Sequence, residues 1–177
     1  MNRWIRNALL CAGLVLATAS PANALPIEAS VGTGPDLATI VLEFQDGADF
    51  VFEVAFDDSL GLSGIGVMQI LEAELASFSL VVLDFGFGLF IDQITYDGHT
   101  DGGFVAPDGF WHYWTKETSA DPWAFSQVGA IDRIVTDGNQ DAWKWGPGSP
   151  IPEPGTAVLV GLGVAALAGR RRAQSSR

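Results

Sequence analysis

An uncharged apolar run near the C-terminus, Ala157–Gly169, most constrains what this chain can fold into. An apolar segment at a chain end has no core to enter, and this one is shorter than the ~20 residues that comfortably span a bilayer. Pro152-Glu153-Pro154 precedes it and Arg170-Arg171-Arg172 follows it. The prolines keep the Glu153 carboxylate on an extended, exposed backbone, and the arginines stay on the cytoplasmic side of a membrane segment. This order of three segments predicts a C-terminal tail that another protein recognises.

The three-part tail closely resembles the PEP-CTERM sorting signal of Gram-negative bacteria that make exopolysaccharide. The matching residues are Pro152, Glu153 and Pro154, the apolar run, and Arg170, Arg171 and Arg172. The resemblance implies recognition by an exosortase, a membrane-embedded cysteine protease, then release or transfer to the cell surface. We expect residues 147–177 to be a linker and sorting signal, with a hydrophobic transmembrane helix at about 155–169. An ordinary C-terminal membrane anchor is the alternative, and it also leaves the chain exported and tethered.

The N-terminus predicts export as well. Arg3 and Arg6 precede an apolar segment at Ala8–Ala17, and Ala22-Asn23-Ala24 has the small-x-small pattern of a cleavage site. These are the three regions of a secretory signal peptide. Residues 1–24 are therefore expected to form a signal helix that signal peptidase removes after Ala24. The chain would cross the inner membrane, stay membrane-anchored by its tail as an intermediate, and reach the cell surface or the medium.

Composition narrows the class of the mature protein. The single cysteine, Cys11, lies in the signal peptide, so the rest has no disulfide framework and no thiol nucleophile. Residues 25–150 carry 20 acidic residues against Lys116, Arg133 and Lys144, a surplus of 17 negative charges. Such a surface repels phosphate backbones and anionic head groups, which excludes nucleic acid as a partner. Cations and neutral or basic polymers remain compatible as partners of this acidic surface. The charge also keeps a secreted protein soluble.

The hydrophobic pattern predicts a small α+β domain at residues 39–146. Residues 39–44 and the alternating segment 49–56 read as a β-hairpin, and residues 25–38 as a loosely held lead-in without periodicity. From Ser63, a possible N-cap, the apolar residues follow a helical spacing. Residues 78–85, 89–96, 110–114, 123–126, 133–135 and 143–145 then read as strands. The order favours a small mixed β-sheet packed on one helix, flanked by the signal helix and the C-terminal hydrophobic helix.

A second resemblance concerns this central region. It rests on Trp111-His112-Tyr113-Trp114, the segment Trp123–Ala130, Asp137-Gly138 and Trp143. These residues resemble the transcobalamin C-terminal-like domain of secreted bacterial proteins, a domain of unknown function. The resemblance implies a β-grasp-like fold. In transcobalamins a second, larger helical domain does most of the corrinoid binding, and this chain has no room for one, so we expect no cofactor.

The sequence offers few groups for catalysis or metal binding. His99 and His112 are the only imidazoles, and no nucleophile or metalloprotease motif is present, so we expect no enzyme and no catalytic residue. Asp97-x-His99-x-Asp101, with Asp108 at the twelfth position, and Asp137-x-Asn139-x-Asp141 have the alternate spacing of calcium loops. Asp-Gly is also a favoured turn pair. Calcium stays an open question, and we predict no metal site.

The aromatic run at 110–114 is the strongest binding candidate. If it is a strand, Trp111 and Tyr113 share one face, and exposed rings of this kind stack on sugars. The alternative is that they fill the core. We therefore expect a structural or exopolysaccharide-associated protein of the cell surface or extracellular matrix. The alternative function is a membrane-tethered small-ligand binding module, which a deep apolar pocket near Trp111 would favour over a flat aromatic face.

Overall fold

The computed structural model describes residues 25–86, 88–104 and 109–150. All of them lie within one compact unit. The predicted signal helix and C-terminal hydrophobic helix lie outside the described residues. Within the described ranges, no helix has both the length and the apolar character needed to cross a membrane.

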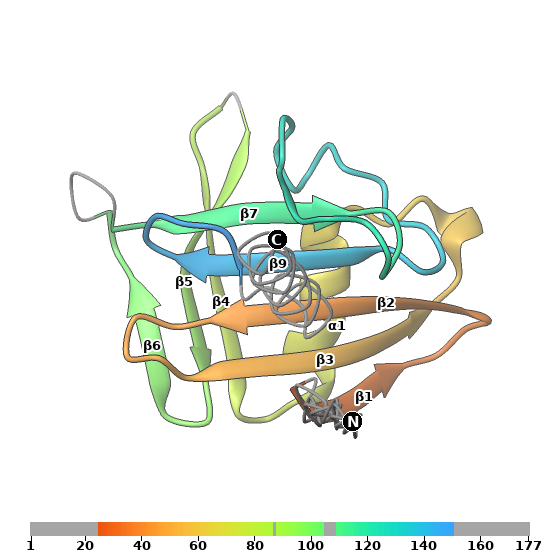
Figure 1. The fold of residues 1–177 in the computed structure, drawn as a ribbon, viewed down its shortest axis with the longest axis horizontal. Helices are drawn as coiled ribbons and strands as arrows, with labels where there is room; N and C mark the ends of the chain where they lie inside the picture. The colour runs from red at the N-terminus through yellow and green to blue at the C-terminus, as the bar shows by residue number, and fades with distance from the viewer. Residues whose placement is uncertain (1–24, 87, 105–108, 151–177) are drawn as a thin grey trace, which may run out of the picture. The chain divides into compact units, whose positions relative to one another are not determined.

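The larger layer is a six-stranded sheet (Figure 1). Its strand order is β1 (Ile27–Gly32), β3 (Asp49–Phe56), β2 (Asp36–Glu43), β9 (Gln140–Trp145), β7 (Trp111–Lys116) and β8 (Ala124–Phe125). The predicted hairpin is confirmed as β2 and β3, which pair antiparallel along their whole length. The pairs β1–β3 and β2–β9 are parallel, and β7 pairs antiparallel with both β9 and β8. The sheet is therefore mixed.

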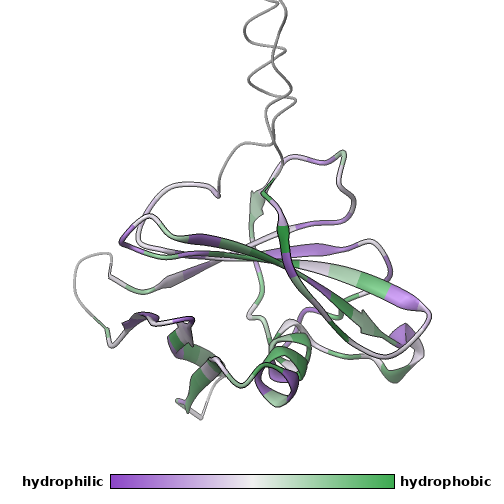
Figure 2. Ribbon diagram, turned by 90° about the horizontal axis from the view of Figure 1, so that it is seen from below, coloured by the Kyte–Doolittle hydropathy of each residue, from purple (hydrophilic) through white to green (hydrophobic). Residues whose placement is uncertain are grey.

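The second layer combines one helix with a smaller sheet. After the 3-10 turn η1 (Asp58–Leu60), the chain forms α1 (Gly64–Glu74) and then β4 (Phe78–Asp84), β5 (Leu89–Tyr96) and β6 (His99–Gly102). These three strands form an antiparallel sheet of their own. Figure 1 shows β4 and β5 crossing behind the larger sheet, and Figure 2 shows α1 on one side of that sheet.

The core fills the space between the two layers. The inward face of the hairpin contributes Ile40, Leu42, Phe52, Val54 and Phe56, all at most 1% exposed. The second layer contributes Met68 and Leu71 from α1 together with Phe78, Ile94 and Tyr96. The rings of Phe52 and Tyr96 meet edge to face, with centroids 4.9 Å apart. Each fully buried side chain of this size stabilises the fold by about 1.5–3 kcal/mol relative to an exposed one.

The predicted fold class is wrong. Among the described residues 48% are in strands and 12% in helices, so the domain is mainly β rather than α+β. The expectation of one small mixed sheet on one helix, the β-grasp-like arrangement, fails because β4 and β5 do not join the first hairpin. They pair only with each other and with β6, which forms a separate sheet. The alternation had marked the strands without marking their partners.

The lead-in at residues 25–38 also differs from the expectation. It contains β1, which pairs in parallel with β3, and the start of β2. Gly32 has a φ of 80°, and a Cβ there would collide with the backbone carbonyl of Ala55. Glycine thus permits close backbone approach at this strand end. The Gly- and Pro-rich composition suggested a loose segment, whereas glycine lets the edge strand pair. The segment 133–135, predicted as a strand, makes only an isolated bridge between Ser63 and Ile134.

The predicted helix is confirmed. Its N-cap is Ser63, whose hydroxyl accepts a hydrogen bond from the Gly66 N–H at 3.1 Å. The apolar stripe lies against the core, with Val67 and Leu71 fully buried. The apolar face of the helix is therefore part of the core.

We expect Ser63→Ala to lower the free energy of unfolding by about 1 kcal/mol, because it removes the cap from a helix end that keeps its backbone donors. Urea denaturation measures the effect. The exposed serine Ser79 in β4 provides the control, and Ser79→Ala should change stability by less than about 0.5 kcal/mol. Equal effects of the two substitutions would show that the cap contributes nothing.

Candidate binding pocket

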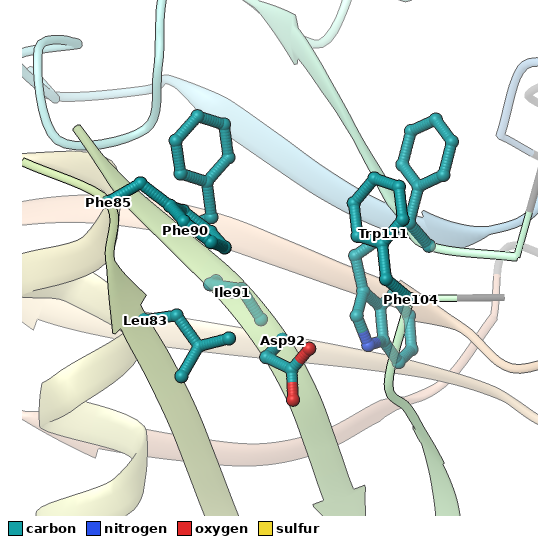
Figure 3. A pocket seen from close by; sticks show the side chains of 8 residues that line it. Leu83, Phe85, Phe90, Ile91, Asp92, Phe104 and Trp111 are labelled. Carbon is teal, nitrogen blue, oxygen red and sulfur yellow. The ribbon is translucent and has the colours of Figure 1, made fainter. Parts of the chain in front are cut away.

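An apolar pocket of about 350 Å³ lies where the smaller sheet meets β7. Leu83 comes from β4, Ile91 and Asp92 from β5, and Trp111 from β7. In Figure 3, Leu83, Phe85 and Phe90 lie on one side and Phe104 and Trp111 on the other, with the Asp92 carboxylate between them. The volume falls within the range of about 300–1,000 Å³ typical of small-ligand sites.

Aromatic rings form most of the pocket wall. They are Phe85, Phe90, Phe104, Phe110 and Trp111. Phe85 and Phe90 meet edge to face at 5.4 Å, and Phe104 stacks on Phe110 with an angle of 3° between the rings. Phe85 is 53% exposed and Phe104 is 76% exposed. Large rings that remain exposed around a hollow, rather than scattered over the surface, are typical of an interaction site.

A β-bulge brings a charge into this apolar wall. In the β4–β5 ladder Val81 pairs with Gln93 and Val82 with Ile91, so Asp92 has no partner of its own. A bulge re-aims side chains locally, and here both Ile91 and Asp92 line the pocket although they are adjacent in the strand. Adjacent strand residues otherwise point to opposite faces. Asp92 is thus directed to the pocket by an irregularity of the sheet.

Trp111 and Tyr113, the two predicted ligand-binding residues, share the core-facing side of β7. Trp111 is 7% exposed, and its indole N–H donates to the Asp101 carbonyl at 3.1 Å. Its ring also forms part of the pocket wall. Tyr113 does not line the pocket, because its ring stacks on Trp143 with centroids 4.7 Å apart. Of the two alternatives, exposed rings or core filling, the structure agrees with core filling, since that face packs on the second layer.

Tyr113 instead belongs to a buried polar network. Its hydroxyl donates to Asp141 at 2.5 Å, and the Arg133 Nε donates to the other carboxylate oxygen at 3.0 Å. Arg133 also reaches Glu117 at 3.0 Å and Asn139 at 3.1 Å. The Asp141 side chain is 1% exposed, so these bonds replace the hydration it has lost. The network joins β7, β9 and the segment between them.

The ionisation of this network follows from burial and from the neighbouring charges. Burial, followed by the charge of Asp141, raises the pKa of Tyr113 far above its ordinary value, so the hydroxyl keeps its proton and donates it. Burial raises the pKa of Asp141, while the hydrogen bonds from Tyr113 and Arg133 oppose this shift. Burial lowers the pKa of Arg133, but Asp141 and Glu117 more than offset it, and the guanidinium stays charged. The hydrogen-bond donors of Tyr113 and Arg133 and the acceptor oxygens of Asp141 are thus paired with one another.

In the first segment with calcium-loop spacing, His99 and Asp101 make other contacts. His99 Nδ1 lies 2.6 Å from Asp46, and this hydrogen bond lowers the pKa of that carboxyl. Asp101 accepts the backbone N–H of Gln45 at 2.7 Å. Asp108 lies outside the described residues.

The side chains of the second segment with calcium-loop spacing are also engaged in separate contacts. Asp137 accepts the backbone N–H of Leu37 at 2.9 Å, whereas Asn139 and Asp141 belong to the Arg133 network. Among the described residues, neither loop contributes to a cluster of three or more carboxylate or imidazole groups. The carboxylates that the structure does gather are those of Asp36, Asp57 and Asp58, within 4.8 Å of one another. There Asp36 accepts the Asp58 N–H and Asp57 caps the 3-10 turn.

Comparison with known proteins concerns the tail. Residues 150–172 match the family model of the PEP-CTERM protein-sorting motif. The chain therefore carries this sorting signal, which implies an exported protein with a signal peptide, processed by an exosortase. No curated protein matches the chain. The predicted sorting residues Pro152, Glu153, Pro154, Arg170, Arg171 and Arg172, and the predicted signal-peptidase residues Ala22 and Ala24, lie outside the described residues.

The pocket residues other than Trp111 were missed by the sequence analysis. The segment that holds Phe85 and Phe90 was interpreted only as two strands around a glycine pivot. One signal was available in the sequence. The aromatic residues Phe85 and Phe90 stand at the ends of β4 and β5, where a half-buried hairpin does not need them to fill a core. Asp92 carried no signal, since a bulge has no reliable sequence pattern.

Proposed function

We propose that the exported domain is a binding module for a small, largely apolar ligand. The observation that carries this proposal is the aromatic pocket of about 350 Å³ bordered by Trp111. A concave apolar site with one convergent polar group is the usual form of a small-molecule site. Exosortase processing would then present the module at the cell surface or release it, with the membrane holding it only through the unprocessed tail.

A structural role in the matrix, or contact with exopolysaccharide, was the main prediction from the sequence and is here the second candidate. A flat row of exposed rings would support it, because such rings stack on extended sugar chains. Here apolar side chains face one another across a hollow instead, with Leu83 and Phe85 opposite Phe104 and Trp111 (Figure 3). This arrangement surrounds a small molecule better than it lies along a polymer.

The module is proposed to be non-catalytic. Catalysis by general acids and bases needs groups within hydrogen-bonding reach of a substrate. The buried network of Tyr113, Arg133 and Asp141 is engaged within itself, and none of its members lines the pocket. Among the described residues, the pocket wall offers one carboxylate among apolar side chains, which suits orientation of a ligand.

The proposal is tested with 2-naphthol, a soluble neutral aromatic probe. We expect it to shift the indole N–H resonance of Trp111 in the exported protein, purified from ¹⁵N-labelled host cells, in a saturable manner. Leu83→Trp should weaken binding at least about tenfold, because Leu83 is 39% exposed at the pocket and a larger ring there occupies the hollow. The Trp111 signal is assigned as the one lost in Trp111→Phe.

Phe125→Ala provides the control. Phe125 is a half-exposed ring on β8 that does not line the pocket, so its removal should leave the titration unchanged. Equal weakening by Leu83→Trp and Phe125→Ala would indicate binding to exposed rings in general. No saturable shift in the unmodified protein would overturn the proposed function.

A further inference from the structure

The single charge in the pocket wall has no partner in the part of the chain that the structure describes. Asp92 is half-buried, and neither a hydrogen bond nor an ion pair is formed by its carboxylate there. A carboxylate that loses part of its hydration is unfavourable unless a donor or a positive charge compensates it. The bulge in β5 nevertheless places it among aromatic rings. Among the described lining residues there is thus no positive group beside Asp92, and a ligand can supply one.

The rings around Asp92 favour the same kind of ligand. Their faces carry negative electrostatic potential and attract cations within about 6 Å of the ring centroid. Phe90, Phe104 and Trp111 border the pocket together with Asp92. Aromatic faces combined with one carboxylate match an ammonium group that carries apolar substituents. A bare divalent cation is a poorer match, because calcium takes six to eight oxygen ligands.

The charge of the whole domain acts in the same direction. Residues 25–150 have a surplus of 17 negative charges. A surface of one sign raises the local concentration of oppositely charged ligands and speeds their association. Anionic amphiphiles, which would otherwise suit an apolar pocket, are repelled.

We propose that the pocket binds an organic ammonium cation, with the charged head beside Asp92 and the apolar groups against the rings of Phe90, Phe104 and Trp111. This inference rests on the proposed function, and it adds the charge of the ligand. Asp92 is the residue that distinguishes a cation from a neutral molecule of the same shape.

The test uses a matched pair of probes. Choline and 3,3-dimethylbutan-1-ol have the same shape, but only choline is charged. Each is titrated into the exported protein while the Trp111 indole N–H resonance is followed. We expect choline to bind at least about tenfold more tightly than the alcohol. Asp92→Asn should weaken choline to the level of the alcohol and leave the alcohol unchanged.

Asp84→Asn provides the matched control. Asp84 is an exposed carboxylate at the end of β4 that does not line the pocket, and it accepts the Gly86 N–H at 2.7 Å. The substitution removes the same net charge as Asp92→Asn, so the protein should still bind choline more tightly than the alcohol. Equal losses in both variants would assign the preference to net charge and overturn the role of Asp92.

The remaining outcomes separate this inference from the proposed function. If both probes bind with equal affinity and Asp92→Asn changes neither, the pocket is a ligand site and the ammonium inference is wrong. If neither probe shifts the Trp111 resonance while 2-naphthol does, the ammonium inference is also wrong. If none of the three probes binds, the proposed function fails together with the inference.

Discussion

Replacement of Asp141 by alanine is expected to lower the free energy of unfolding by about 3–5 kcal/mol, the usual effect of removing one partner of a buried ion pair. Arg133 would keep its charge with its side chain only 11% exposed, and the hydroxyl of Tyr113 would lose its acceptor. Urea denaturation followed by tryptophan fluorescence measures the change. A domain of ordinary stability has about 5–15 kcal/mol in total, so the variant would unfold at far lower urea.

The control for this prediction is Glu117→Gln. Glu117 also pairs with Arg133, but its side chain is 68% exposed. Exposed pairs contribute about 0–1 kcal/mol, so the variant should stay close to the unmodified protein. A second variant, Asp141→Asn, keeps the shape and an acceptor oxygen and should fall between the two. If Asp141→Ala lowered the free energy of unfolding by less than about 1 kcal/mol, water would be replacing the carboxylate. The network would then contribute little to the stability of the fold.

Gly64→Ala is the second prediction of large effect, and its sign is opposite to helix propensity. Alanine in a helix is normally about 1 kcal/mol better than glycine. At Gly64 an added Cβ would lie 2.5 Å from the Tyr113 hydroxyl oxygen and 3.1 Å from both Ala130 O and Asp141 Oδ2. Neither the backbone carbonyl nor the hydrogen-bonded hydroxyl can move freely. We expect a net loss of about 1–3 kcal/mol, the range for overpacking.

The same helix provides a matched control. A Cβ on Gly66 would meet only side-chain atoms of Leu62 and Ser63, at 3.5 Å or more, which is ordinary contact. Gly66→Ala should therefore stabilise the protein by up to about 1 kcal/mol. Adding Tyr113→Phe to Gly64→Ala removes the closest atom and should recover part of the loss. Stabilisation by both alanines would show that the sheet and the helix separate easily at this point.

The elements of this fold were largely predictable, because each has a local cause. The alternation at 49–56 and the turn before it predicted the hairpin, and Ser63 with the stripe behind it predicted the helix. In each case a period and a terminating residue stand within a few positions of one another. The sorting motif at 150–172 was likewise predictable from three adjacent segments.

The fold class and the pocket were not predictable, because both depend on pairing between distant strands. Alternation says which side chains share a face, and it does not say which strand lies alongside. Trp111 and Tyr113 were therefore correctly grouped on one face, but the sequence left open whether that face is exposed or packs against the core. Asp92 enters the pocket through a bulge, and Phe104 from the irregular segment that follows β6. Such features appear only when two strands are paired.

The place of β9 in the larger sheet has a consequence for export. This strand lies between β2 and β7, and its residue Lys144 bonds Glu43, 101 positions earlier in the chain. The sheet thus stays in two halves until residues 140–145 have crossed the membrane, and the matched sorting motif begins at residue 150. Pairing over such distances is slow, because a long loop must close first. Completion of the larger sheet is consequently expected no earlier than the arrival of the sorting signal at the membrane.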